Sequence, residues 1–327
     1  MTLSRTTILA LVSLALSACE GDQKAAGAIT IGMIPKLTGI PYFNACQRGA
    51  EEAARELGVK LVYDGPLTAD AARQNEIVNA WILKGFHAIA VAPNNPEAMA
   101  GVLAKARERG LRVVSWDTDA LPGPRELFCN QLQASAMAAA LLEILHEELK
   151  GAGRVALVSG TETAANQNAW MALMREQAKA KYPKLVLLDP PEYPGEDDAR
   201  AYAATQGLLR RSDRPDAVVG MTSVSAPAAA KAVFDSGLAG KVAVTGITSP
   251  QVMRPYVKNG TVKKFVLWSP IDLGYLTIHA AARLARGGPV PSEIDAGRLG
   301  KLKVENGQAL LGPPLVFTAE TIDRYDF

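Results

Sequence analysis

The chain has 327 residues, enough for one large domain or two ordinary ones, because single hydrophobic cores stop growing near about 250–300 residues. Its 48% hydrophobic and 21% charged residues are typical of a folded globular protein and exclude extensive disorder. With 35 basic and 33 acidic residues the formal net charge is only +2, which argues against a nucleic-acid-binding protein. Three cysteines and three scattered histidines exclude a disulfide scaffold and provide no spaced set of metal ligands.

The first residues follow the order of a secretory signal, with a positive charge at Arg5, an apolar run and then small residues. The run is too short to span a bilayer. Segment 16–19 (LSAC) resembles a bacterial lipobox, in which Cys19 carries a lipid anchor. The alternative is an ordinary signal peptide cleaved near the same point. We therefore predict a lipoprotein signal peptide at 1–18, a flexible tether at 19–28 and a lipid-anchored location in the periplasm.

From residue 29 the sequence alternates between short apolar runs and segments with apolar residues at three- and four-residue spacing. Continuous apolar runs are typical of parallel strands covered on both faces, and the spacing is that of amphipathic helices. Gly58, Gly85 and Gly110 each follow a predicted helix, where a left-handed cap is favoured. Strands are predicted at 29–34, 59–63, 88–92 and 111–116, with helices at 44–57, 72–84 and 96–109 between them. This order predicts an α/β fold with a doubly wound parallel sheet.

A break at 121–124 (LPGP) precedes a second series, because these residues cannot continue a helix or a central strand. Strands are predicted at 155–159, 185–188, 217–219 and 242–247, with helices at 135–149, 167–181, 198–211, 227–235 and 251–258. The tail contains a strand at 264–268, a helix at 272–286 and extended pieces at 302–304 and 315–317. These elements are too few for a third domain, so we expect the tail to complete the two sheets. A chain that returns to each lobe forms a hinged cleft.

Ligands of open α/β sheets bind beyond the carboxyl ends of the strands, so the residues after each predicted strand are the candidates for a site. They include carboxylates, amides, hydroxyls and aromatics, a mixture that suits a neutral polyol. The candidate ligand-binding residues are Lys36, Tyr42, Phe43, Asp117, Asn166, Gln167, Ser223 and Trp268. No glycine-rich phosphate loop, serine nucleophile motif or metal-ligand set occurs, so we expect no enzymatic activity, cofactor or metal.

These candidates also have structural explanations. Asp117 could cap the following segment, and Asn166 could cap the helix that begins there. Tyr42 could form a hydrophobic staple at a helix start. Trp116 and Trp170 are expected to pack in the core rather than to face a pocket. Each explanation would suffice for one residue alone, whereas polar groups and aromatics that converge from both lobes indicate a binding site.

Two cysteines remain in the predicted globular part. Cys46 and Cys129 could pair in an oxidising compartment, although they lie on elements that need not meet. The alternative is a pair of separate buried thiols that behave as small apolar side chains.

Several segments together resemble one family of proteins. They are 34–39 (IPKLTG), 63–66 (YDGP), 115–119 (SWDTD), 166–170 (NQNAW), 252–257 (VMRPYV) and 322–327 (IDRYDF). They resemble the type I periplasmic sugar-binding proteins of ABC importers, over essentially all of 29–327, and within that group the autoinducer-2-binding and rhamnose-binding branch. The resemblance implies two doubly wound parallel-sheet lobes joined by a three-crossing hinge, with crossings near 120–131, 265–268 and 290–293. It implies an N-terminal lobe of 29–120 plus 268–291 and a C-terminal lobe of 121–267 plus 292–327.

The resemblance also assigns roles by position. The autoinducer-2 receptors bind their ligand through a lysine and the first aspartate of a W-D-x-D motif, which would be Lys36 and Asp117 here. Their Asp-Gln pair is 166–167 (NQ) in this chain, and their Pro-Asp-Ala segment is replaced by 221–223 (MTS). Ser269 stands where they have an aspartate after a late tryptophan. Segments 166–168 (NQN), 270–275 (PIDLGY) and 292–298 (SEIDAGR) are more similar to the rhamnose-binding branch.

These features predict a solute-binding lipoprotein of an ABC importer that binds a rhamnose-like 6-deoxyhexose between its lobes and delivers it to the permease subunits. The alternatives are an autoinducer-2 receptor of a quorum-signal importer and a sensory protein that presents a bound sugar to a receptor. A repressor core shares this fold, but it would carry a DNA-binding motif where this chain has a secretion signal. We expect a monomer that meets the membrane through its lipid anchor only and binds no nucleic acid.

Overall fold

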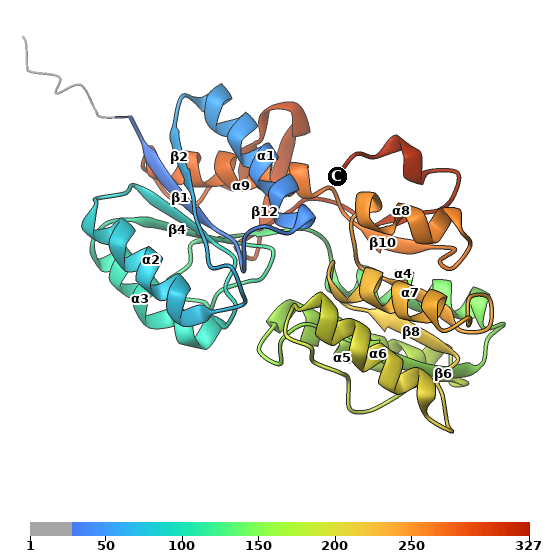
Figure 1. The fold of residues 1–327 in the computed structure, drawn as a ribbon. Helices are drawn as coiled ribbons and strands as arrows, with labels where there is room; N and C mark the ends of the chain where they lie inside the picture. Colours follow the sequence, from blue (N-terminus) through green and yellow to red (C-terminus); the bar gives the residue numbers. More distant parts are fainter. Residues whose placement is uncertain (1–27) are drawn as a thin grey trace, which may run out of the picture.

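The computed structural model describes residues 28–327, and Figure 1 shows that they form two α/β lobes side by side. The predicted α/β class with two doubly wound, mostly parallel sheets is confirmed. The predicted signal peptide and the anchor residue Cys19 lie outside the described residues. Within the described part, no helix has the length and apolar character that crossing a membrane requires.

The sheet of the first lobe is built around five parallel strands in a doubly wound order. From the edge inward, these are β2 (Lys60–Tyr63), β1 (Thr30–Ile34), β3 (Ala88–Val91), β4 (Arg112–Trp116) and β5 (Leu127–Asn130). One face packs against α1 (Pro41–Leu57) and α9 (Pro270–Ala285), and the other against α2 (Ala71–Leu83) and α3 (Pro96–Glu108). Side chains alternate between these layers, since Ala88 and Ala90 face one cluster while Ile89 and Val91 face the other. Burial on both faces explains why these strands read as continuous apolar runs.

Two glycines allow α1 and α9 to approach each other closely. A Cβ atom placed on Gly49 would lie 1.8 Å from the backbone oxygen of Ile271, and one on Gly274 would lie 1.9 Å from that of Cys46. Any other residue at either position would therefore force the two backbones apart. This contact fixes α9, which comes late in the chain, onto the first lobe.

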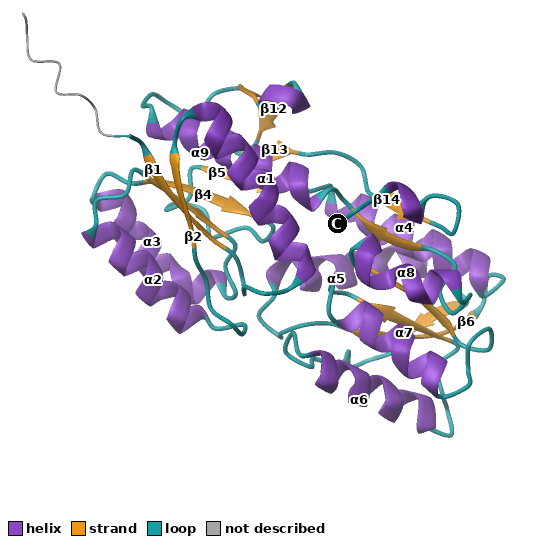
Figure 2. Ribbon diagram, turned by 45° about the horizontal axis from the view of Figure 1, so that its top comes forward, coloured by secondary structure: helices purple, strands orange, loops and turns teal. Residues whose placement is uncertain are grey.

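The second lobe has a four-stranded parallel sheet in the order β7 (Leu185–Leu187), β6 (Gly153–Val158), β8 (Ala217–Gly220) and β9 (Ala243–Gly246). Its helices are α4 (Ala134–Glu148), α5 (Ala165–Lys181), α6 (Asp198–Arg210), α7 (Ser225–Asp235) and α8 (Pro250–Lys258). The antiparallel pair of β10 (Phe265–Leu267) and β14 (Leu315–Phe317) adjoins β9 through a bridge between Ile247 and Val266. Figure 2 shows this pair beside α8, at the side of the lobe where the chain ends.

The C-terminal segment lies in the structure differently from the predicted lobe boundaries. Strands β11 (Glu293–Asp295), β12 (Lys301–Glu305) and β13 (Gln308–Leu310) extend the first sheet, with β13 parallel to β5. A tight turn makes this possible, because Asn306 and Gly307 both have positive φ, of 51° and 70°, between antiparallel strands. The assignments of 127–130 and of 293–310 to the C-terminal lobe were therefore wrong. Single-turn 3-10 helices occur at Gly297–Leu299 and Ile322–Arg324.

The chain passes between the lobes three times. The first passage, at 131–133, joins β5 to α4, and the second, at 268–269, joins β10 to α9. Both are close to their predicted positions. The third passage, at 311–314, joins β13 to β14. It was predicted near 290–293, but it comes later because the chain first completes the outer edge of the first sheet. Among residues 28–327, Cys46 and Cys129 are buried and form no disulfide, so the alternative of two separate buried thiols is the correct one.

Candidate ligand-binding site

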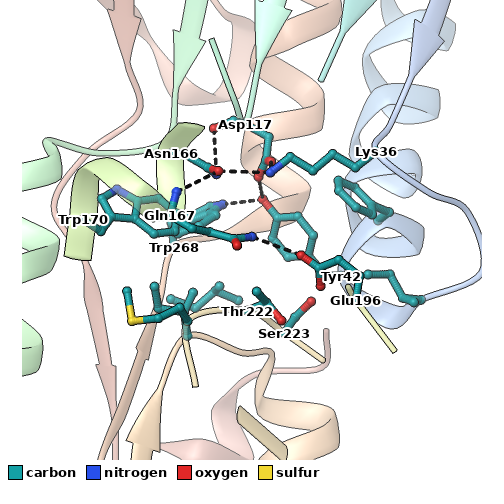
Figure 3. A pocket seen from close by; sticks show the side chains of 15 residues that line it. Lys36, Tyr42, Asp117, Asn166, Gln167, Trp170, Glu196, Thr222, Ser223 and Trp268 are labelled. Carbon is teal, nitrogen blue, oxygen red and sulfur yellow. Dashed lines mark hydrogen bonds and ion pairs between the residues drawn. The ribbon is translucent and has the colours of Figure 1, made fainter. Parts of the chain in front are cut away.

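A pocket lies between the two lobes, at the carboxyl ends of β1, β4, β6, β8 and β10 (Figure 3). The structure brings together in its lining all eight residues selected from the sequence: Lys36, Tyr42, Phe43, Asp117, Asn166, Gln167, Ser223 and Trp268. The lining also contains Ile40, Trp170, Glu196, Met221, Thr222, Ile247 and Leu267.

Asp117 is the centre of a polar network on the first lobe. It follows β4 with a φ of 61°, a left-handed conformation that aspartate tolerates better than most residues. Its Oδ1 accepts a hydrogen bond of 2.7 Å from the Tyr42 hydroxyl, which in turn accepts one of 3.0 Å from Nε1 of Trp268. The Lys36 ammonium lies 3.6 Å from Oδ2 of the same carboxylate. The carboxylate therefore faces the pocket and caps no helix.

Asn166 meets this network from the second lobe. Its Oδ1 accepts a hydrogen bond of 3.0 Å from Nζ of Lys36, and its Nδ2 donates one of 3.4 Å to the backbone oxygen of Asp117 (Figure 3). The N-cap of α5 is Ala164, so Asn166 lies inside the first turn and the capping explanation for it is wrong. The first turn of α5 thus directs an amide across the cleft toward a lysine and an aspartate.

Glu196 adds a second carboxylate that the sequence analysis missed. Nε2 of Gln167 donates a hydrogen bond of 3.0 Å to its Oε1. Burial, the largest cause, raises the pKa of Glu196, while the nearby Lys36 ammonium opposes the rise. The residue comes at the end of a loop after β7 and just before Asp197, whose side chain caps α6.

Aromatic side chains form one wall of the pocket. The rings of Tyr42 and Trp268 meet edge to face with centroids 5.7 Å apart, and Trp170 lies 5.9 Å from Trp268. Trp116 is fully buried behind Phe43, as predicted. The expectation for Trp170 was wrong in part, because its ring is buried and also lines the pocket.

Two further polar residues near the strand ends have structural roles. Ser269 caps α9, its Oγ accepting a hydrogen bond from the backbone N–H of Asp272 at 3.2 Å. Asp119 pairs with Arg125 at 2.8 Å and accepts a hydrogen bond of 2.5 Å from Ser115. Neither lines the pocket. Asp119 is therefore useful as a control for substitutions at Asp117.

The lining combines two carboxylates, one ammonium, two amides and several hydroxyls with a wall of aromatic and aliphatic side chains. Within residues 28–327 no cluster of three or more histidine, cysteine or acidic side chains is placed to hold a metal ion. Such a lining can donate hydrogen bonds to hydroxyl groups, accept them and cover an apolar ring face.

Comparison with known sequences identifies the family. The family described as periplasmic binding protein domain matches residues 31–289, which is most of the chain. The chain belongs to this family. As a periplasmic binding protein it shares the two-lobed architecture of several solved structures, which cover 91% of its length.

Three solved structures illustrate the similarity. A sugar ABC transporter protein from Actinomyces odontolyticus is 35% identical, with a TM-score of 0.74 and 97% of its chain covered. An ABC transporter solute-binding protein from Clostridium phytofermentas with bound L-rhamnose is 29% identical, with a TM-score of 0.85 and 98% covered. LsrB from Clostridium saccharobutylicum in complex with AI-2 is 26% identical, with a TM-score of 0.88 and 100% covered.

Proposed function

We propose that this chain is the extracytoplasmic solute-binding protein of an ABC importer, and that it binds a neutral monosaccharide in the pocket between its lobes and delivers it to the permease. The observation that carries the proposal is the convergence of Lys36 and Asp117 from one lobe with Asn166 and Gln167 from the other, beside Trp268. Family membership and the solute-binding relatives support it.

The geometry explains how a sugar would couple to closure. Lys36 and Asn166 already bond across the lobes, so the lobes come within hydrogen-bond distance at this point. A sugar hydroxyl both donates and accepts, and can therefore bridge a carboxylate on one lobe and an amide on the other. A ligand that contacts both lobes at once stabilises the closed arrangement over an open one, which is the signal that a permease can recognise.

We further propose a rhamnose-like 6-deoxyhexose as the ligand. The amide of Asn166 offers donors as well as an acceptor, which suits a ring of alternating hydroxyls better than a carboxylate that only accepts. The methyl group of such a sugar would pack against Phe43 or Trp268. The second candidate is autoinducer-2, because Lys36, Asp117 and Gln167 match the binding residues of its receptors and a relative binds AI-2.

Titration calorimetry on one preparation of the mature protein, with L-rhamnose and with autoinducer-2, tests this assignment. We expect L-rhamnose to bind at least about tenfold more tightly, a difference of about 1.4 kcal/mol. Tighter binding of autoinducer-2 would contradict the ligand but keep the solute-binding role. Absence of heat with L-rhamnose and with other monosaccharides titrated in the same way would contradict sugar binding itself.

A lipid anchor completes the proposal. Acylation of Cys19 would hold the protein at the membrane through the short tether at 19–28, close to the permease that it serves.

A further inference from the structure

We propose that Glu196 is a ligand-contacting specificity residue, which accepts a hydrogen bond from a sugar hydroxyl on the side of the ring that faces the second lobe. The inference rests on the proposed sugar-binding function and deepens it. It makes the pocket a two-carboxylate site, with Asp117 on one lobe and Glu196 on the other, and it restricts the ligand to neutral sugars that donate hydroxyl hydrogens at both edges.

The backbone at Glu196 is held in an unfavourable conformation. Gly195 has a φ of 80° and Glu196 a φ of 59°, so two successive residues are left-handed. This conformation is unfavourable for glutamate, which lacks the short polar side chain that lets aspartate and asparagine tolerate it. Strain of this kind persists mainly at functional sites, where the surrounding structure imposes it. Here it directs the Glu196 side chain back into the pocket instead of out to solvent.

The carboxylate is held in a fixed orientation by a chain of hydrogen bonds. Oε1 of Gln167 accepts from Oγ of Ser159 at 2.9 Å and from the N–H of Gly160 at 3.0 Å. The amide of Gln167 is therefore oriented, with its Nε2 donating to Oε1 of Glu196 at 3.0 Å. A Cβ atom on Gly160 would lie 2.3 Å from that oxygen, so the absence of a side chain there leaves room for the carboxylate. Gln167 thus acts as a positioning residue for Glu196.

The place of Glu196 in the cleft points to a ligand role. It lines both the inner pocket and the outer groove between the lobes, a position shared with Ile40 and Ser223. A carboxylate has about four acceptor sites, more than the neighbouring Gln167 amide and Thr222 hydroxyl can satisfy. Glu196 is half-buried, so the cleft shields its carboxylate only in part, and burial raises the pKa of this group. Hydroxyl groups of a bound sugar can supply the missing donors.

This arrangement predicts what the pocket rejects. A sugar that lacks the hydroxyl facing Glu196 would leave a half-buried carboxylate without one of its donors, which penalises such a sugar in a site built to hydrogen-bond that group. Sugar acids and sugar phosphates would be repelled, because two acidic side chains, Asp117 and Glu196, line the pocket against the single ammonium of Lys36. The inferred ligand class is therefore neutral and polyhydroxylated.

The test uses Glu196→Gln, which keeps the shape of the side chain and removes its charge. Asp198→Asn is the matched control, because Asp198, the first residue of α6, is an exposed acid two positions away that lines only the outer groove. Affinities for L-rhamnose, D-ribose, D-arabinose, D-glucose and D-galactose are first measured on the wild type by calorimetry. The tightest of these is then compared with its mono-deoxy analogues on all three proteins, and melting curves show that each variant is folded.

We expect Glu196→Gln to weaken the tightest sugar by about tenfold to a hundredfold, the contribution of a hydrogen bond to a charged group, and Asp198→Asn to leave it unchanged. One deoxy analogue should bind wild type and Glu196→Gln equally, since it lacks the hydroxyl that Glu196 accepts from. Equal sugar affinity in wild type and Glu196→Gln, or the same loss for every analogue, would overturn the inference and leave the sugar-binding function standing. A wild type that binds none of the sugars would overturn both.

Discussion

Substitution of Asp117 by asparagine is the sharpest test of the site. Asparagine keeps the size of the side chain and also tolerates the φ of 61°, whereas alanine would add backbone strain that obscures the loss of the carboxylate. The substitution leaves Tyr42 with an oxygen to donate to, but it removes the charge that faces the Lys36 ammonium at 3.6 Å.

The structure sets the size of the expected effect. A hydrogen bond to a charged group contributes about 1.5–3 kcal/mol, so loss of one sugar hydroxyl bond to the Asp117 carboxylate should weaken binding by about 10- to 150-fold. Lys36 is 4% exposed and keeps only the Asn166 oxygen as a hydrogen-bond acceptor. Breaking a buried ion pair costs up to about 3–5 kcal/mol. We therefore expect the melting temperature of Asp117→Asn to fall as well.

Calorimetry and melting curves on Asp117→Asn and Asp119→Asn separate the two effects. Asp119 pairs with Arg125 outside the pocket, so its substitution should lower stability without changing affinity for L-rhamnose. Asp117→Asn should lower both. If Asp117→Asn binds the sugar as tightly as the wild type, the carboxylate does not contact the ligand and the assignment of the pocket fails.

Three further predictions concern stability and location. Burial raises the pKa of Glu196, so its ionisation lowers the free energy of unfolding as the pH rises from the ordinary glutamate pKa toward the raised value. Glu196→Gln should therefore have a higher melting temperature than the wild type at about pH 7, and the same melting temperature at about pH 3. Gly274→Ala should lower the free energy of unfolding by about 3 kcal/mol or more in denaturant titrations, since its Cβ would lie 1.9 Å from a backbone oxygen, whereas Gly207→Ala, with open space around it, should not. Cys19→Ser should move the protein from the membrane to the soluble periplasmic fraction with unchanged sugar affinity, and unacylated wild type in mass spectrometry would refute the anchor.

Much of the fold is predictable because strands buried on both faces leave an unmistakable pattern. The predicted strand at 88–92 and helix at 96–109 agree with β3 and α3 to within a residue at each end. The missed strands are short and depend on partners. β13 has only three residues and exists because β5 presents an open edge to it, a long-range pairing that local sequence does not encode. The Asn306-Gly307 turn was a readable hairpin signal that would have placed β12 and β13 together.

The candidate site was predictable where its residues directly follow strands. Lys36, Asp117 and Ser223 each come within three residues of a strand end, and parallel topology brings such positions to one edge. Glu196 comes nine residues after β7, across a proline-rich loop. Its return to the pocket depends on the positive φ at Gly195 and on the hydrogen bond from Gln167, which are tertiary features. The sequence Gly-Glu-Asp-Asp at 195–198 is also typical of the start of a helix, and of these residues only Asp197 caps α6.

A crystal structure of the mature protein grown with L-rhamnose would test sugar binding between the lobes most directly. We expect one sugar between the lobes, with hydroxyl oxygens within about 3.2 Å of the Asp117 carboxylate and of the Asn166 amide, and the ring against Trp268. Sugar bound anywhere else on the protein, or a closed cleft that holds no sugar at saturating concentration, would contradict it.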